Sequence, residues 1–331
     1  MAETLERLAL DPPLRVGPGI LDETLAALED SFALISQPVP LEHLDAALRG
    51  RATAERLVAS LSRESLEALE ADVPPVLTVV GIGGGVVMDA AKYVAWRRGC
   101  RLILAPSIVS GDVCVTNTIA VRDEGTVTYR GFVVASLIVI DTDLIRAAPS
   151  HFNRAGIGDI VSIHTALWDW ARGAELGHAH FDPAAVEQSA AVLAGIETIA
   201  AEIRRVTPRT VEAIVRAYVR SNAICLQVGH TQSEEGSAEH YFAYCLEALT
   251  GHSFVHGQVI GLGTVLMSTL QGNDPERVRR ILREAGVEWL PEPLALALER
   301  LGRPCPSSPR QPALADSLMP YAPVMGRLPV R

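Results

Sequence analysis

Residues 77–92 read LTVVGIGGGVVMDAAK, and this stretch decides the expected fold of the N-terminal part. A short apolar run, a cluster of glycines and an amphipathic segment follow one another, which predicts a strand, a tight loop and a helix. Glycines in the loop permit positive φ and let backbone N–H groups approach a ligand. The helix N-terminus that follows suits a diphosphate. The alternative is a plain tight turn, because the spacing is neither GxGxxG nor a Walker loop.

Two charged residues of the expected helix, Asp89 and Lys92, lie three positions apart. In one interpretation they form a surface ion pair worth a few tenths of a kcal/mol. In the other, Asp89 turns back towards the glycine loop and fixes it.

The first 147 residues repeat this alternation of apolar runs and amphipathic segments. Expected strands are Leu14–Val16, Phe32–Ser36, Leu57–Ala59, Leu77–Gly81, Leu102–Ala105, Ile119–Arg122 and Leu137–Asp141. Expected helices are Leu21–Glu29, Leu41–Leu48, Glu64–Ala71 and Val86–Arg97. Runs such as LIVI are apolar throughout, which indicates a sheet covered on both faces. We therefore expect residues 1–147 to form an α/β Rossmann-like domain with a doubly wound parallel sheet.

Residues 148–331 show helical periodicity almost throughout and predict an all-α second domain. Expected helices are Asp159–Arg172, Pro183–Arg204, Thr207–Val228, Ser237–Leu249, His256–Leu270, Pro275–Glu284, Pro293–Leu301 and a short one at Ala313–Tyr321.

Composition excludes several classes of protein. The net charge of −10, from 29 basic and 39 acidic residues, argues against a general nucleic-acid binder. The longest apolar runs reach about ten residues, half of what a membrane-spanning helix needs. Five cysteines without a CxxC pair indicate reduced thiols in a cytoplasmic protein.

Three residues in separate helical patterns are candidate metal ligands. Asp159 lies among apolar neighbours, and a buried carboxylate needs a partner such as a metal. His240 and His256 lie in two helical patterns joined by a turn, so facing helices could point both rings into one cleft. Such a set leaves open positions and suits Zn²⁺, Fe²⁺, Ni²⁺ or Mn²⁺. The alternatives are satisfied core histidines and an aspartate that caps a helix after Gly158.

Six segments occur in the order seen in a known family. They are GIGGGVVMDAAKYVAW (81–96), APSIVSGDV (105–113), LIVIDTDLIRAAP (137–149), AGIGDIVSIHTALWDW (155–170), GSAEHYFAYCLE (236–247) and HGQVIGLGT (256–264). Over about residues 14–270 the chain thereby resembles the glycerol-1-phosphate dehydrogenase branch of the iron-containing alcohol dehydrogenase and dehydroquinate synthase superfamily.

The resemblance implies the dehydroquinate synthase-like fold and a metal-dependent, NAD(P)-linked oxidoreductase. Such an enzyme would interconvert the secondary alcohol of a small polyol, or polyol phosphate, and its ketone. A homodimer or a larger assembly is also implied. The residues that match family positions are Gly83, Gly84, Gly85 and Asp89 for the NAD or NADP diphosphate, Ser107 and Ser110 near the nicotinamide, Asp112 near the substrate, and Asp159, His240 and His256 as ligands of one divalent metal, with zinc preferred over iron or nickel.

The sequence also differs from the family pattern. Ile163 stands where the wider alcohol dehydrogenases carry another histidine, so three protein ligands are expected. Tyr244 replaces a second histidine, and its hydroxyl either relays a proton or only packs. The other candidate proton carriers are metal-bound water, Asp112 and His252, the last of which lies in an expected turn. The first long strand ends without an acidic ribose-binding residue, which leaves NADP open beside NAD.

The loop HTQSEEGSAEH (230–240) carries Glu234 and Glu235 before the Glu-His pair, and no arginine. An acidic loop is a poor neighbour for a phosphorylated substrate. Two rival functions remain. A sugar-phosphate cyclase of the dehydroquinate synthase type would use the same cofactors without net NADH change, and a non-catalytic family member would bind nucleotide or a partner only.

Overall fold

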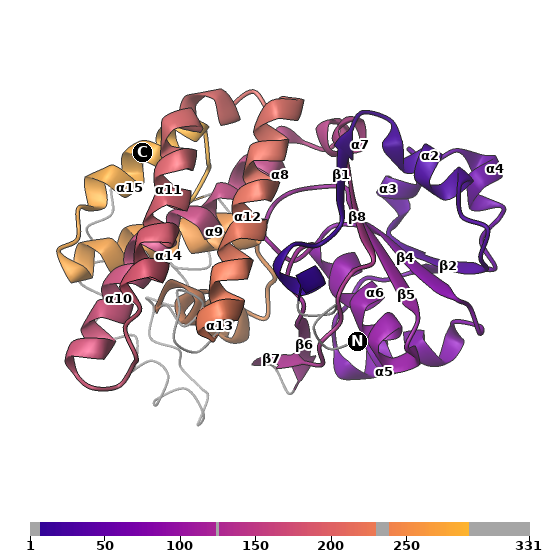
Figure 1. The fold of residues 1–331 in the computed structure, drawn as a ribbon, viewed down its shortest axis with the longest axis horizontal. Coiled ribbons are helices and arrows are strands. Elements are labelled where there is room, and N and C mark those ends of the chain that lie inside the picture. The colour runs from indigo at the N-terminus through magenta and orange to yellow at the C-terminus, as the bar shows by residue number, and fades with distance from the viewer. Residues whose placement is uncertain (1–6, 124–125, 230–237, 291–331) are drawn as a thin grey trace.

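The computed structural model describes residues 7–123, 126–229 and 238–290. A parallel sheet with its flanking helices forms one half of the molecule, and helices form the other (Figure 1). Within the described residues, no helix combines the length and the apolarity that crossing a bilayer requires.

Six parallel strands form the main sheet, in the order β1-β8-β5-β4-β2-β3. They are β1 (Leu14–Gly17), β2 (Phe32–Ser36), β3 (Ala54–Leu57), β4 (Thr78–Gly83), β5 (Arg101–Pro106) and β8 (Leu137–Asp141). A separate antiparallel pair consists of β6 (Ile119–Asp123) and β7 (Thr126–Arg130). Strand β4 pairs with β5 up to Gly83 and Pro106, so the glycine loop and the loop after β5 leave the same edge of the sheet.

Both faces of the sheet are buried, as the apolar runs predict. The helices of this half are α2 (Ile20–Ala26), α3 (Pro38–Leu41), α4 (Ala46–Arg49), α5 (Arg63–Asp72), α6 (Gly85–Arg98) and α7 (Thr142–Ala147). Along β2, Ala33 and Ile35 join the core that contains α5 and α6, whereas Phe32 and Leu34 join the core that contains α2. Alternate residues therefore enter two different cores, and the predicted parallel α/β sheet is confirmed.

Only helices follow β8 in the described part of the chain. They are α7 and then α8 (Ser150–Ala155), α9 (Ile157–Val161), α10 (Ile163–Glu175), α11 (Pro183–Ile203), α12 (Pro208–Val228), α13 (Ala238–Thr250), α14 (His256–Gln271) and α15 (Pro275–Ala285). The domain boundary near residue 147 stays a prediction. The expected helices at Pro293–Leu301 and Ala313–Tyr321 lie outside the described residues.

Several expected elements are wrong in position or extent. The helix expected at Leu41–Leu48 is two short helices, because the Asp45 side chain accepts hydrogen bonds from the N–H groups of Ala47 and Leu48 and starts α4. The strand expected at Leu57–Ala59 is β3, which begins three residues earlier. Its sequence AERL lacks a continuous apolar run because β3 is an edge strand of the sheet.

The helix expected at Asp159–Arg172 is interrupted at Ser162, whose hydroxyl donates to the carbonyl of Asp159. Strand β7 was not predicted at all.

Candidate metal centre

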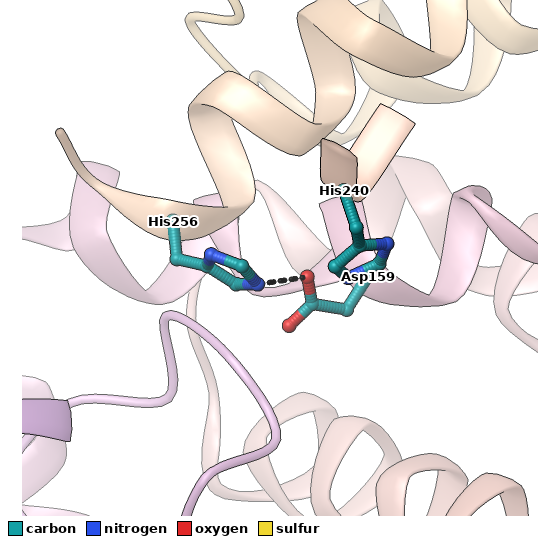
Figure 2. Close-up of side chains that lie close together, drawn as sticks. All are labelled: Asp159, His240 and His256. Carbon is teal, nitrogen blue, oxygen red and sulfur yellow. Dashed lines mark ion pairs between the residues drawn. The ribbon is translucent and has the colours of Figure 1, made fainter. Parts of the chain in front are cut away.

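Three side chains from three helices converge on one point. Asp159 lies in α9, His240 in α13, and His256 is the first residue of α14 (Figure 2). One potential ligand atom of each lies within 4.8 Å of those of the other two. Asp159 Oδ1 is 3.2 Å from His256 Nε2, and the two imidazole centroids are 5.5 Å apart. Two nitrogens and one carboxylate at this spacing match a divalent metal site with open positions.

The Asp159 carboxylate fits a metal better than it fits a helix cap. Both of its oxygens are buried; Oδ1 lies 3.2 Å from His256 Nε2, and no other described residue donates a hydrogen bond to either oxygen. Helix α9 begins after Gly156, and no side chain caps it, so the helix-cap interpretation is wrong. A buried carboxylate with so few hydrogen-bond donors is costly unless a cation compensates it.

The electrostatics around His256 favour a positive charge. Burial of the ring works against its charged form, but the Asp159 carboxylate outweighs that effect and, with Asp112 and Glu247, raises the pKa of His256 to about 9. At neutral pH a proton therefore occupies the place that a metal would take, and metal binding must displace it.

Two glycines bring Asp159 and His256 together. A Cβ on Gly158 would lie 2.1 Å from the carbonyl oxygen of Gly257, and a Cβ on Gly257 would lie 1.9 Å from that of Ala155. Helices α9 and α14 thus cross backbone against backbone, at a distance that only glycine permits. Each glycine is the direct neighbour of a candidate ligand, so the crossing fixes the separation of the two side chains.

A buried carboxylate stands behind His240. Glu239 is fully buried, its Oε1 lies 3.3 Å from His240 Nδ1, and its Oε2 accepts a hydrogen bond of 2.9 Å from the Thr165 hydroxyl. A hydrogen bond from Nδ1 to this carboxylate would set the ring's tautomer and orientation and leave the ligand role to Nε2.

The loop after β5 connects the glycine loop to these side chains. The Ser107 N–H donates to the carbonyl of Gly83 (2.9 Å), and the Ser110 carbonyl accepts from the N–H of Gly257 (3.2 Å). Between them, the Val109 N–H donates to the buried side chain of Asn153 (3.0 Å). The loop therefore runs from the sheet edge to the metal site, and Ser107 and Ser110 lie at its two ends.

The glycines of the 81–85 loop act differently from what the sequence predicted. None of the glycines at 81, 83, 84 and 85 has positive φ. A Cβ on Gly81 would lie 2.6 Å from that of Ala91, and a Cβ on Gly83 would lie 2.4 Å from Cγ2 of Val87. These two glycines let α6 pack closely on β4. Gly84 and Gly85 stand at the N-terminus of α6, where the first amides have no partner within the helix.

Asp89 and Lys92 form a buried ion pair. The two side chains are 6% and 1% exposed, and Lys92 Nζ lies 2.9 Å from Asp89 Oδ1. The same ammonium donates to the Thr116 hydroxyl and to the Thr118 carbonyl. Burial raises the pKa of Asp89, although Lys92 acts in the opposite direction. The surface-pair interpretation is therefore wrong.

The candidate proton carriers differ in their placement. Asp112 lines a pocket together with Asp159, Ser162, Ser221, Asn222, Cys225 and His240. The ring of Tyr244 lies 6.4 Å from that of His240, and its hydroxyl contacts the Tyr129 hydroxyl of β7. His252 is exposed in the turn between α13 and α14, and its ring lies against Phe254. The structure thus brings Asp112 and Tyr244 to the site and leaves His252 at the surface.

Sequence reasoning missed the residues that hold these parts in place. Asn153 secures the loop after β5, the Tyr218 hydroxyl donates to the Gly156 carbonyl at the start of α9, and Glu239 stands behind His240. The sequence did contain one signal of this packing, the glycine next to each of Asp159 and His256, which allows α9 and α14 to cross closely. The acidic loop residues 230–237 lie outside the described residues.

Comparisons with known proteins show which families the chain is similar to. A sequence model of the iron-containing alcohol dehydrogenase family matches residues 39–149. A glycerol-1-phosphate dehydrogenase [NAD(P)+] of Hyperthermus butylicus is 29% identical over 310 residues, which cover 89% of this chain and 88% of that protein.

Solved structures show the same fold. A probable glycerol dehydrogenase from Sinorhizobium meliloti matches with a TM-score of 0.68 at 20% identity, covering 96% of this chain and 98% of its own. A 2-deoxy-scyllo-inosose synthase matches with a TM-score of 0.62 at 14% identity, covering 86% and 85%. Because a dehydrogenase and a synthase both share it, the fold alone does not decide the reaction.

Proposed function

Since the chain belongs to the iron-containing alcohol dehydrogenase superfamily, on its glycerol-1-phosphate dehydrogenase branch, we propose that it is a metal-dependent, NAD(P)-linked oxidoreductase. It interconverts the secondary alcohol of a small polyol, or polyol phosphate, and the corresponding ketone. The observation that carries this proposal is the convergence of Asp159, His240 and His256 beside the loop that reaches back to the glycine turn.

The metal-binding residues in this proposal are Asp159, His240 and His256, and the preferred metal is zinc. A divalent metal at this point supplies Lewis acidity to the oxygen of the alcohol or ketone. The protein contributes the orientation, because Glu239 aligns His240 and the α9–α14 crossing fixes the other two side chains.

The dinucleotide, NAD or NADP, lies along the sheet edge in this proposal. Its diphosphate meets the α6 N-terminus at Gly83, Gly84 and Gly85. Asp89 lies within α6 and pairs with Lys92. The Lys92 ammonium also donates to Thr116 and Thr118, so this pair connects α6 to the segment between β5 and β6. The nicotinamide end, which carries the hydride, lies near Ser107 and Ser110. From there the loop leads to Gly111, where an added Cβ would lie 3.1 Å from Asp159 Oδ2.

The proton that accompanies hydride transfer needs a carrier in the same pocket. We assign this role first to Asp112, because it lines the pocket beside Asp159 and His240. Tyr244 is the second candidate, through its position beside His240. His252 would need the turn at 251–255 to move inward.

The proposal also includes a cytoplasmic homodimer. None of the four cysteines in the described residues forms a disulfide, as expected in a reducing compartment. Light scattering of the purified protein tests the oligomeric state directly.

One experiment separates the proposed function from its rivals. The protein is stripped with a chelator, reloaded with Zn²⁺, Fe²⁺, Ni²⁺ or Mn²⁺, and assayed for NAD(P)H absorbance and for product with polyols, polyol phosphates and their ketones. Metal-dependent absorbance change that matches product formation supports the dehydrogenase. Product without net absorbance change supports a cyclase, and NAD(P)H binding without turnover or metal uptake supports a non-catalytic protein.

A further inference from the structure

Resting on the proposed function, we propose that the substrate is an uncharged polyol and that Asn222 of α12 recognises one of its hydroxyl groups. The inference combines an unsatisfied acceptor in the pocket wall with the charges around it.

The buried carbonyl oxygen of Asn222 lacks a partner. Asn222 is 2% exposed and lines the pocket that contains Asp159 and His240. Its amide group donates to the Val115 carbonyl (3.4 Å), which turns Oδ1 away from that contact. Oδ1 is buried and accepts no hydrogen bond from any described residue. A buried acceptor without a donor costs about 1–3 kcal/mol, so a ligand hydroxyl that donates here gains affinity.

Several groups in the pocket wall are hydrogen-bond acceptors. Asp112 and Asp159 contribute carboxylates, and Asn222 contributes an amide oxygen. The Ser162 hydroxyl already donates to the Asp159 carbonyl, so its remaining capacity towards a ligand is that of an acceptor. A polyol offers a hydroxyl proton at each carbon, whereas a phosphate near pH 7 is mostly dianionic and offers oxygens that only accept. The wall therefore complements hydroxyl groups.

Two cationic side chains of the described residues in the sheet half are already paired with carboxylates. Lys92, the single lysine of the chain, is fully buried and paired with Asp89. Arg122 lies 3.2 Å from Glu247. No arginine or lysine is among the described residues that line the pocket.

The overall charge of the site points the same way. A divalent cation is balanced by the carboxylates of Asp112 and Asp159. A phosphate group would add about two negative charges without a compensating partner, which is unfavourable in a partly buried site.

The first test compares substrates on the metal-loaded enzyme. We measure kcat/KM for glycerol and for glycerol 1-phosphate with NAD⁺ and with NADP⁺. The expected preference for glycerol is on the order of tenfold or more. A preference for the phosphate overturns this inference and leaves the proposed function standing. Turnover of neither compound, nor of their ketones in the reverse direction, overturns both.

The second test removes the acceptor. Asn222→Ala should raise the KM for glycerol on the order of tenfold, with kcat and bound metal little changed, because one ground-state hydrogen bond is lost. The control is Asn117→Ala, since Asn117 is also buried (5% exposed) with an unpaired side-chain amide but does not line the pocket. The control should lose comparable thermal stability and keep its KM. An Asn222→Ala enzyme that is folded, metal-loaded and unchanged in KM overturns the assignment.

Discussion

Glycines allow a close approach at the β4–α6 turn and at the α9–α14 crossing, and these two places differ in what the glycines approach. At the β4–α6 turn, the neighbours of an added Cβ are the side chains of Ala91 and Val87. At the α9–α14 crossing, the neighbours are backbone carbonyl oxygens, at 1.9 and 2.1 Å. A side chain can shift, but a helix backbone moves only with its whole element. The α9–α14 crossing is therefore less tolerant of an added side chain than the β4–α6 turn. A substitution at the crossing should abolish activity rather than weaken cofactor binding.

The largest effect is expected for Gly257→Ala. The new methyl group meets the carbonyl of Ala155, the last residue of α8, and must push α14 away from the α8–α9 junction, which separates His256 from Asp159. We expect a loss of about 3 kcal/mol or more in the free energy of unfolding and at least about a hundredfold loss of activity. Denaturant titration, metal analysis and steady-state assays measure these changes.

A matched control for that variant is Gly195→Ala, in the exposed face of α11, where an added Cβ meets nothing within 4 Å. This change should stabilise the protein by about 0.5–1 kcal/mol. Wild-type metal content in Gly257→Ala would contradict the role given to the crossing.

Lys92→Met tests the buried pair on the cofactor side. It leaves the Asp89 carboxylate buried without its cation, which should cost about 3 kcal/mol of stability. Because the pair lies on α6, the metal content of the folded protein should stay unchanged. The double variant Asp89→Asn/Lys92→Met removes both charges and should recover much of the loss. If the double variant is as unstable as Lys92→Met, the pair interaction is not the cause.

Gly83→Ala tests the close packing of α6 on β4 at the β4–α6 turn. The new Cβ meets the Val87 side chain at 2.4 Å, so we expect a cost of about 1–3 kcal/mol and weaker NAD(P)H binding. Metal binding should persist. Fluorescence titration with NAD(P)H and metal analysis give both readouts. In contrast, Gly84→Ala meets only the tip of Ile108, at 3.2 Å, and should be less destabilising.

The smallest effect concerns the helical half alone. Glu197 of α11 binds Arg277 and Arg280 of α15 (2.7 Å and 2.5 Å). The hydrogen bond from Arg277, with that from Arg280, holds the pKa of Glu197 below its ordinary value of 4.5. A depressed carboxyl pKa stabilises the fold above that value, and the stabilisation is lost as the pH falls through the folded pKa. Glu197→Gln should therefore cost up to about 1 kcal/mol at pH 7, and the gap to wild type should shrink in thermal melts as the pH falls below the ordinary value of 4.5. A gap that is constant with pH would contradict this account.

The sheet half was the more predictable from sequence. Phe32–Ser36 and Leu137–Asp141 were predicted with their observed bounds, because continuous apolar runs leave little ambiguity. The elements that failed are short and polar. The strand at Thr126–Arg130 has no apolar run, and Asp45 divides an apparently single helical pattern.

Of the candidate site, the sequence predicted the three possible metal ligands but not the residues that surround them. The helical periods of Asp159, His240 and His256, with the family resemblance, were enough to predict their convergence, and the structure brings them together. Asn153, Asn222 and Glu239 carry no motif, and their contacts with Val109, Val115 and Thr165 join residues that lie 44, 107 and 74 positions apart in the sequence. Such contacts depend on tertiary packing, which local patterns do not contain.

The most direct test of the central claim is the metal content of His256→Ala after dialysis against zinc and removal of excess metal. The account predicts one bound metal per chain in the wild type and in the surface variant His252→Ala. It predicts almost none in His256→Ala, with NAD(P)H affinity largely intact. One tightly bound metal per chain in His256→Ala, with wild-type turnover, would contradict it.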